Sequence, residues 1–189
     1  KYAIWCSSLL EQLQKGFVYF WKKRGLKVYE PKSPQAGLVF NNKRSYIEHA
    51  KAELGTSAGT AIGYYSFQTN RIVMYDLTGS EAFRRENTRR GSKKNITALL
   101  QDPRAEPLVA TILHEATHQL AFNCGLQTRF VDNPIWLSEG VAVYFETPNL
   151  NSSRLWSGTD QVNVSRWNLY RRNVRSDKAA NLTTLIADD

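Results

Sequence analysis

Two histidines one helical turn apart, with a glutamate between them, are the residues of this chain best suited to chemistry. They form the sequence His114-Glu115-Ala116-Thr117-His118. On a helix, positions i and i+4 share one face, so His114 and His118 can present their imidazoles to one tetrahedral zinc ion. Glu115 lies off that line, where its carboxylate can hold a water molecule that the metal polarises. Shuffled copies of this sequence contain such a motif in roughly a quarter of a percent of cases, so chance is a weak explanation.

The residues around this motif place it in the middle of a helix. Asp102 and Pro103 are expected as the N-cap and the first helical residue, and Gly125 as the C-terminal stop. The apolar residues with helical spacing are Leu108, Val109, Ile112, Leu113, Ala116, Leu120 and Ala121. The alternative is a buried amphipathic helix whose two histidines have no metal. Burying two histidines and a glutamate without partners would cost several kcal/mol, which favours the metal site.

A catalytic zinc site needs a third protein ligand beside the two histidines and a water molecule. No histidine follows His118, so the third ligand is expected to be a carboxylate on the next predicted helix. Glu139 is favoured because the link between the two helices is short and because Gly140 would let the facing helix or the metal approach closely. Two alternatives stay open: Glu146 is the ligand, or Glu139 is a surface acid.

The rest of the chain predicts an α+β fold. Three further helices are expected at Ser8–Lys23, at Ser45–Leu54 with a capping box of Ser45 and Glu48, and from Asn133 and Pro134 to a stop at Pro148. Short strands are expected at Leu26–Tyr29 and Gly37–Phe40, and a hairpin is expected from Thr60–Phe67 and Arg71–Asp76. The charged segment 83–94 is predicted to be a loop or an exposed helix, and 164–174 a basic helical run.

Length and composition predict one domain. The chain has 189 residues, 42% of them hydrophobic, which is enough for a substantial core. We expect a single domain over 1–189, with a core at about 8–148 and a C-terminal extension at 149–189. No apolar run is long enough to span a bilayer. The chain begins at Lys1 without a signal-peptide pattern, which indicates a piece of a longer protein. A secreted or cell-envelope location is our expectation.

The net charge of +8 raises the question of an acidic partner. A basic surface could bind nucleic acid, anionic lipid or an acidic substrate, but no nucleic-acid-binding motif accompanies it. Solvated basic surfaces are therefore expected, without a nucleic-acid partner. A disulfide between Cys6 and Cys124 is allowed but not implied. The third histidine, His49, belongs to no motif and is predicted to lie on the surface.

The motif and the run from Trp136 to Glu146 together resemble the gluzincins, which are zinc metallopeptidases of the peptidase MA clan. The run reads Trp-Leu-Ser-Glu-Gly-Val-Ala and is similar to the Trp-Leu-x-Glu-Gly-x-Ala helix of the aminopeptidase branch. Over about 8–148 the chain also resembles a bacterial peptidase-MA-like family of unknown function. The resemblance implies His114, His118 and Glu139 as zinc ligands and Glu115 as general base.

The same resemblance implies a zincin-like fold, in which the edge strand of a small mixed or antiparallel sheet lies along the cleft above the motif helix. The predicted hairpin of Thr60–Phe67 and Arg71–Asp76 is the candidate for that edge. The chain departs from the aminopeptidases, because their Gly-x-Met-Glu-Asn segment is absent and Ile62-Gly63-Tyr64-Tyr65 stands near its place. Nothing therefore argues for an exopeptidase.

Two supporting roles are left open by the resemblance. Thermolysin-like enzymes have an aspartate four residues after the glutamate ligand, but Val143 occupies that position here. Asp132 or Glu146 would have to support a histidine ligand instead. For a hydroxyl that stabilises the transition state, the candidates are Tyr64, Tyr65 and Tyr170, each of which is also suited to packing.

The predicted function is that of a zinc-dependent peptidase acting on a peptide or protein substrate. A zinc-stabilised scaffold without turnover is the second hypothesis, and the intact Glu115 counts against it. A basic nucleic-acid-binding module is the third, and the missing aromatic-basic motif counts against that one.

Overall fold

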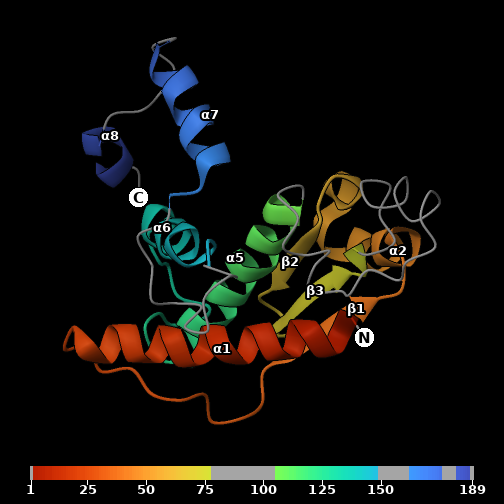
Figure 1. The fold of residues 1–189 in the computed structure, drawn as a ribbon, viewed down its shortest axis with the longest axis horizontal. Helices are drawn as coiled ribbons and strands as arrows, with labels where there is room; N and C mark the ends of the chain where they lie inside the picture. Colours follow the sequence, from red (N-terminus) through yellow and green to blue (C-terminus); the bar gives the residue numbers. More distant parts are fainter. Residues whose placement is uncertain (1, 78–104, 149–161, 176–181, 188–189) are drawn as a thin grey trace, which may run out of the picture.

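The chain folds into a small mixed sheet flanked by helices, which confirms the predicted α+β class (Figure 1). The computed structural model describes residues 2–77, 105–148, 162–175 and 182–187. In chain order the described elements are α1 (Tyr2–Lys23), β1 (Ala36–Phe40), α2 (Lys43–Leu54), the 3-10 helix η1 (Gly55–Gly59), β2 (Gly63–Ser66), β3 (Arg71–Tyr75), α5 (Glu106–Asn123), α6 (Ile135–Phe145), α7 (Val164–Arg175) and α8 (Leu182–Ala187). None of the helices in these ranges is long and apolar enough to cross a membrane.

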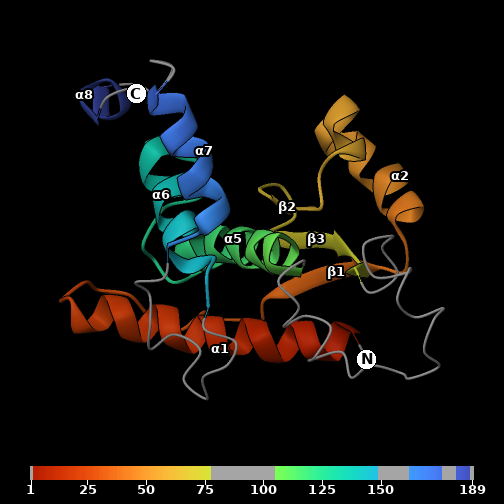
Figure 2. The ribbon, with the colours of Figure 1, turned by 45° about the horizontal axis from the view of Figure 1, so that its top comes forward.

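The sheet has the strand order β1-β3-β2. β1 pairs with β3 in parallel, and β2 pairs with β3 in antiparallel orientation, so the predicted hairpin is confirmed. Asn70 closes the hairpin with a φ of 56°, a conformation that asparagine tolerates better than most residues. Among the described strands, β2 therefore lies at an edge of the sheet, and that edge is next to α5 (Figure 2).

The two faces of the sheet are covered by different helices. On one face, the Tyr46 ring of α2 packs against Tyr75 of β3, with 5.2 Å between the ring centroids. On the other face, Tyr65 of β2 stacks on Phe122 of α5 at 5.8 Å. This arrangement follows from the alternation of side chains along a strand, because Tyr64 and Tyr65 are neighbours and point to opposite faces.

Helix α1 runs past α5 and extends to α6 (Figures 1 and 2). Its apolar stripe, which includes Leu13 and Phe17, is fully buried. Phe17 and Phe20 pack on Phe145 of α6, with ring centroids 4.9 Å and 5.2 Å apart. Aromatic pairs of this kind bury large apolar areas, so α1 fixes the position of α6 relative to α5.

The predicted strand at Leu26–Tyr29 is wrong, because this segment has no strand structure. It follows Gly25, whose φ is 80°, shortly after α1 ends at Lys23. The Tyr29 N–H donates to the Cys124 carbonyl at 3.0 Å, so the segment pairs with the end of α5 instead of the sheet.

The capping box predicted for α2 is also wrong. The helix begins two residues earlier than Ser45, and its N-cap is Asn42, whose side chain accepts the Ser45 N–H at 3.0 Å. Glu48 instead pairs with Arg44, one turn away on the exposed surface. The helix ends at Leu54, as predicted, and Gly55, which has a positive φ, caps it.

The starts of the two motif-bearing helices differ from the prediction. Asp102 and Pro103 lie outside the described residues, as does the segment 83–94, and α5 begins at Glu106. Helix α6 begins at Ile135 with Pro134 as its N-cap, one position later than predicted. Asn133 does not cap this helix, because its side-chain amide donates to the carbonyls of Thr128 and Val131 in the preceding link. The helical run expected at 164–174 is present as α7.

Candidate metal site

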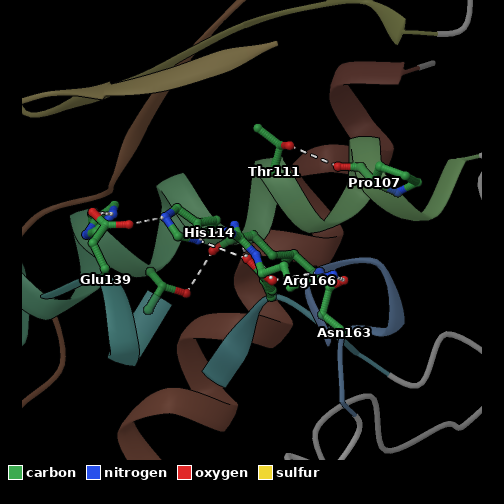
Figure 3. A network of polar contacts seen from close by, with 10 residues as sticks. Pro107, Thr111, His114, Glu139, Asn163 and Arg166 are labelled. Atoms are coloured by element: carbon green, nitrogen blue, oxygen red, sulfur yellow. Dashed lines mark hydrogen bonds and ion pairs between the residues drawn. The ribbon is translucent and has the colours of Figure 1, made fainter. Parts of the chain in front are cut away.

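His114, His118 and Glu139 come together where α5 meets α6, and they form a group that could hold a metal ion. Their ligand atoms all lie within 4.8 Å of one another. One carboxylate oxygen of Glu139 is 3.1 Å from His114 Nε2, and the other is 3.4 Å from His118 Nε2. The two imidazole rings are 4.9 Å apart on one face of α5, as the i and i+4 spacing requires. Figure 3 shows the Glu139 carboxylate directed at the imidazole of His114.

The link between α5 and α6 brings Glu139 to the histidines. Gly125, with a φ of 79°, ends α5, and the N–H groups of Leu126 and Gln127 donate to the Ala121 carbonyl. The side chain of Gln127 then donates to Ser138 Oγ at 2.7 Å, next to Glu139. Among the described residues no facing helix approaches Gly140 closely, since a Cβ there would meet no atom within 4 Å. The close approach of Glu139 to the histidines depends on the link between α5 and α6 and on the packing of α6 on the core.

The three side chains differ in burial. The His114 and His118 side chains are 9% and 12% exposed, whereas that of Glu139 is 53% exposed. Burial lowers the pKa of His114, but hydrogen bonds to the Glu139 and Glu146 carboxylates outweigh burial and raise the pKa to about 9. Hydrogen bonds from the two imidazoles hold the pKa of Glu139 far below its usual range. The site thus places an ionised carboxylate between two imidazoles.

Glu146 supports His114 from the other side of the imidazole ring. Its fully buried carboxylate lies 2.9 Å from His114 Nδ1. A carboxylate at Nδ1 keeps a proton on that nitrogen and leaves Nε2 directed at Glu139. Burial opposes ionisation of Glu146, yet hydrogen bonds from His114 and Arg166 lower its pKa overall. Of the two predicted supporting acids, Glu146 makes this contact, whereas Asp132 is exposed.

Two residues of this network were not identified from the sequence. Arg166, on the first turn of α7, donates to both Glu146 oxygens, from Nη2 at 2.9 Å and from Nε to the other oxygen. Asn163, just before α7, donates to Glu146 at 2.7 Å. The labelled side chains of Arg166 and Asn163 both reach this network in Figure 3. The predicted C-terminal extension therefore holds the acid that supports the histidine. The sequence signal was weak, because Asn163 belongs to no motif of the site and Arg166 is one of many arginines in the chain.

Glu115 leaves the histidine line and faces the edge of the sheet. Its carboxylate accepts the Tyr65 N–H of β2 at 2.9 Å. Burial raises the pKa of Glu115, although the nearby histidines and the Tyr65 N–H oppose that shift. The predicted hairpin thus supplies the strand that holds this carboxylate in place.

The three tyrosines considered for a catalytic hydroxyl lie elsewhere. Tyr65 donates its hydroxyl to Asn70 at 2.8 Å. Tyr64 is buried against Tyr46, on the face of the sheet that α2 covers. Tyr170 is half exposed and stacks on Trp167 within α7. These contacts favour packing roles. His49 is exposed, as predicted, and both cysteines are buried and free.

Comparison with known proteins gives a partial match. The family model described as "Protein of unknown function (DUF1570)" matches residues 108–189. This stretch contains His114, His118, Glu139, Glu146 and Arg166, so it covers the whole candidate metal site. No curated protein matches the chain. No solved structure matches it either.

Proposed function

We propose that this domain is a zinc-dependent peptidase, in which His114, His118 and Glu139 bind zinc and Glu115 is the general base. The observation that carries the proposal is the arrangement of two buried imidazoles around one carboxylate, together with a second carboxylate, that of Glu115 on α5, which accepts an N–H from the edge strand. Imidazole and carboxylate are the donors of catalytic zinc sites that have two histidines and one glutamate. A purely structural site would have no need of Glu115.

The distances between donors are compatible with a zinc ion. Two ligands about 2.0–2.2 Å from a tetrahedral zinc ion are about 3.3–3.6 Å apart. The Glu139 oxygens lie 3.1 Å and 3.4 Å from the two Nε2 atoms, which is close to that separation. Three protein ligands leave the fourth position for water, as catalysis requires.

Each remaining residue then has a defined task. Bound zinc would polarise a water molecule and the carbonyl of the scissile bond. Glu115 takes a proton from that water and passes it to the leaving amine. The Tyr65 N–H orients the Glu115 carboxylate, and Glu146 keeps His114 in the tautomer that presents Nε2.

The edge strand offers a place for the substrate backbone. Tyr65 directs its N–H to Glu115, away from β3, so this edge of β2 faces the site. An extended peptide can pair with such an edge through main-chain hydrogen bonds, while its side chains occupy pockets on alternate sides. The substrate class that fits is therefore an extended peptide or an unfolded segment of a protein.

Metal analysis tests the zinc ligands. The purified wild-type domain should hold about one zinc ion per chain, and His114→Ala should lose tight binding. His49→Ala is the matched control, because His49 is exposed and lies on α2. Full zinc content in His114→Ala would show that the metal binds elsewhere.

Activity measurements test Glu115. Glu115→Gln keeps the shape of the side chain but removes the base, so zinc should stay while hydrolysis of a quenched peptide mixture falls by about 100- to 10,000-fold. Glu48→Gln, an exposed acid on α2, is the control. An equally active Glu115→Gln would remove Glu115 from the mechanism. A wild type that holds zinc but cuts no peptide would favour a scaffold function.

A further inference from the structure

An exposed aromatic surface lies beside the candidate metal site. It consists of Tyr65, Phe67 and Phe122, and we call these three residues the aromatic platform. Phe67 and Phe122 pack edge to face at 5.1 Å, and Tyr65 stacks on Phe122 at 5.8 Å. Phe67 is 48% exposed and Phe122 is partly exposed, whereas Tyr65 is buried beneath them. The platform thus keeps ring surface open to solvent.

The platform lies on the same line of α5 as the two histidines. His114, His118 and Phe122 follow one another at intervals of four residues, so they share one face of the helix. Each step advances about 6 Å along the helix axis. Phe122 therefore lies about 6 Å beyond His118 on the side of α5 that carries the metal group.

Hydrogen bonds define the direction of β2 along α5. The backbone of Tyr65 bonds Glu115, while Asn70, in the turn after β2, bonds Gln119 and Asn123. β2 therefore runs in the same direction as α5, and Figure 2 shows the two elements next to each other. A peptide paired antiparallel to β2 would run the other way, with its N-terminal part toward the platform.

The spacing then gives the position of the substrate side chain. An extended chain advances about 3.3 Å per residue, so 6 Å corresponds to about two residues, which share one side of the strand. The platform faces the residue about two positions N-terminal to the scissile bond.

We propose that the aromatic platform selects substrates with an aromatic or large aliphatic side chain about two residues before the scissile bond. This inference rests on the proposed peptidase function, because the position of the side chain is counted from the scissile bond. A difference of one apolar group in a pocket discriminates between substrates by about 10- to 200-fold. The rings of the platform are partly exposed to solvent, so we expect a preference at the low end of this range. An aromatic residue should therefore be preferred over alanine by about 10-fold in kcat/KM.

Two measurements on one synthetic peptide mixture test the inference. In the first, mass spectrometry maps the bonds cut by the zinc-loaded wild type and by Phe67→Ala and Phe122→Leu. The wild type should show the aromatic preference, and both variants should reduce it. Tyr19→Ala is the control, because Tyr19 is an exposed aromatic residue on α1. Zinc content and the urea unfolding midpoint show whether each variant is folded.

The second measurement does not depend on turnover. The zinc-loaded Glu115→Gln domain is immobilised, and the peptides that it retains from the mixture are identified with and without Phe67→Ala. About 10-fold enrichment of aromatic peptides, lost in the Phe67→Ala background, supports the platform. No enrichment, or no retained peptide, overturns it even if the wild type cuts peptides. Enrichment without any cleavage by the wild type would keep the platform and overturn the proposed peptidase.

Discussion

The two acids that contact His114 should affect zinc binding to different degrees. Glu139 faces the Nε2 atoms of both histidines, at 3.1 Å and 3.4 Å, whereas Glu146 faces only Nδ1 of His114, at 2.9 Å. Glu139→Gln removes an anionic ligand of the proposed zinc site. Glu146→Gln leaves all three ligands in place and removes only the charge that orients one of them.

The expected magnitudes follow from these contacts. Loss of a partner that orients a metal-binding histidine costs about 10- to 100-fold in affinity, or about 1.4–2.7 kcal/mol. Glu146→Gln should fall in that range, and Glu139→Gln should cost more. Arg166→Gln should cost less than Glu146→Gln, because Arg166 is 52% exposed and acts on the site through Glu146. The double variant that combines Glu146→Gln with Arg166→Gln should then lose less zinc affinity than the sum of the two single losses.

A competition titration of metal-free protein against a chromophoric zinc chelator gives these affinities. Circular dichroism and the urea midpoint report whether each variant is folded. The pair Arg44 and Glu48 gives a matched control, because it is a salt bridge of the same charge types on the exposed surface of α2. The reasoning would be refuted by wild-type zinc affinity in Glu146→Gln, by a larger loss in Glu146→Gln than in Glu139→Gln, or by additive losses when Glu146→Gln and Arg166→Gln are combined.

Two further predictions concern the end of α5 and the free thiols. Gly125→Ala should lower the free energy of unfolding by about 1–3 kcal/mol in urea denaturation, because Gly125 has a φ of 79° and a Cβ would come within 2.4 Å of Tyr29. Gly59→Ala is the control, because a Cβ at that position meets nothing within 4 Å. Equal stability of the two variants would contradict this prediction. Burial raises the pKa of Cys6 to about 11 and that of Cys124 to about 12, so neither thiol should react with a thiol reagent at pH 8 until urea unfolds the chain, and rapid labelling of the native protein would contradict it.

Several local features followed from the sequence because local spacing determines them. The i and i+4 positions place His114 and His118 on one face of any helix that contains them. The β-branched and aromatic runs on either side of Asn70 predicted the hairpin, and the helix stops at Gly55 and Gly125 needed only a positive φ. Helix starts were less predictable: Asn42, Ser45 and Asn133 are all suitable caps by type, and only the backbone shows which side chain accepts an N–H group.

The candidate site shows the same division between local and long-range information. The sequence by itself identified the candidate residues: two histidines and Glu115 in one motif, and Glu139 on the next helix. It could not determine what holds them, because those contacts join residues far apart in the chain. Packing of Phe17 on Phe145 positions α6, and the Tyr65 N–H reaches Glu115 across 50 positions of sequence. Only the tertiary structure places Arg166 on Glu146, because a buried carboxylate needs charged or hydrogen-bonding partners and any of the chain's many arginines could have supplied one.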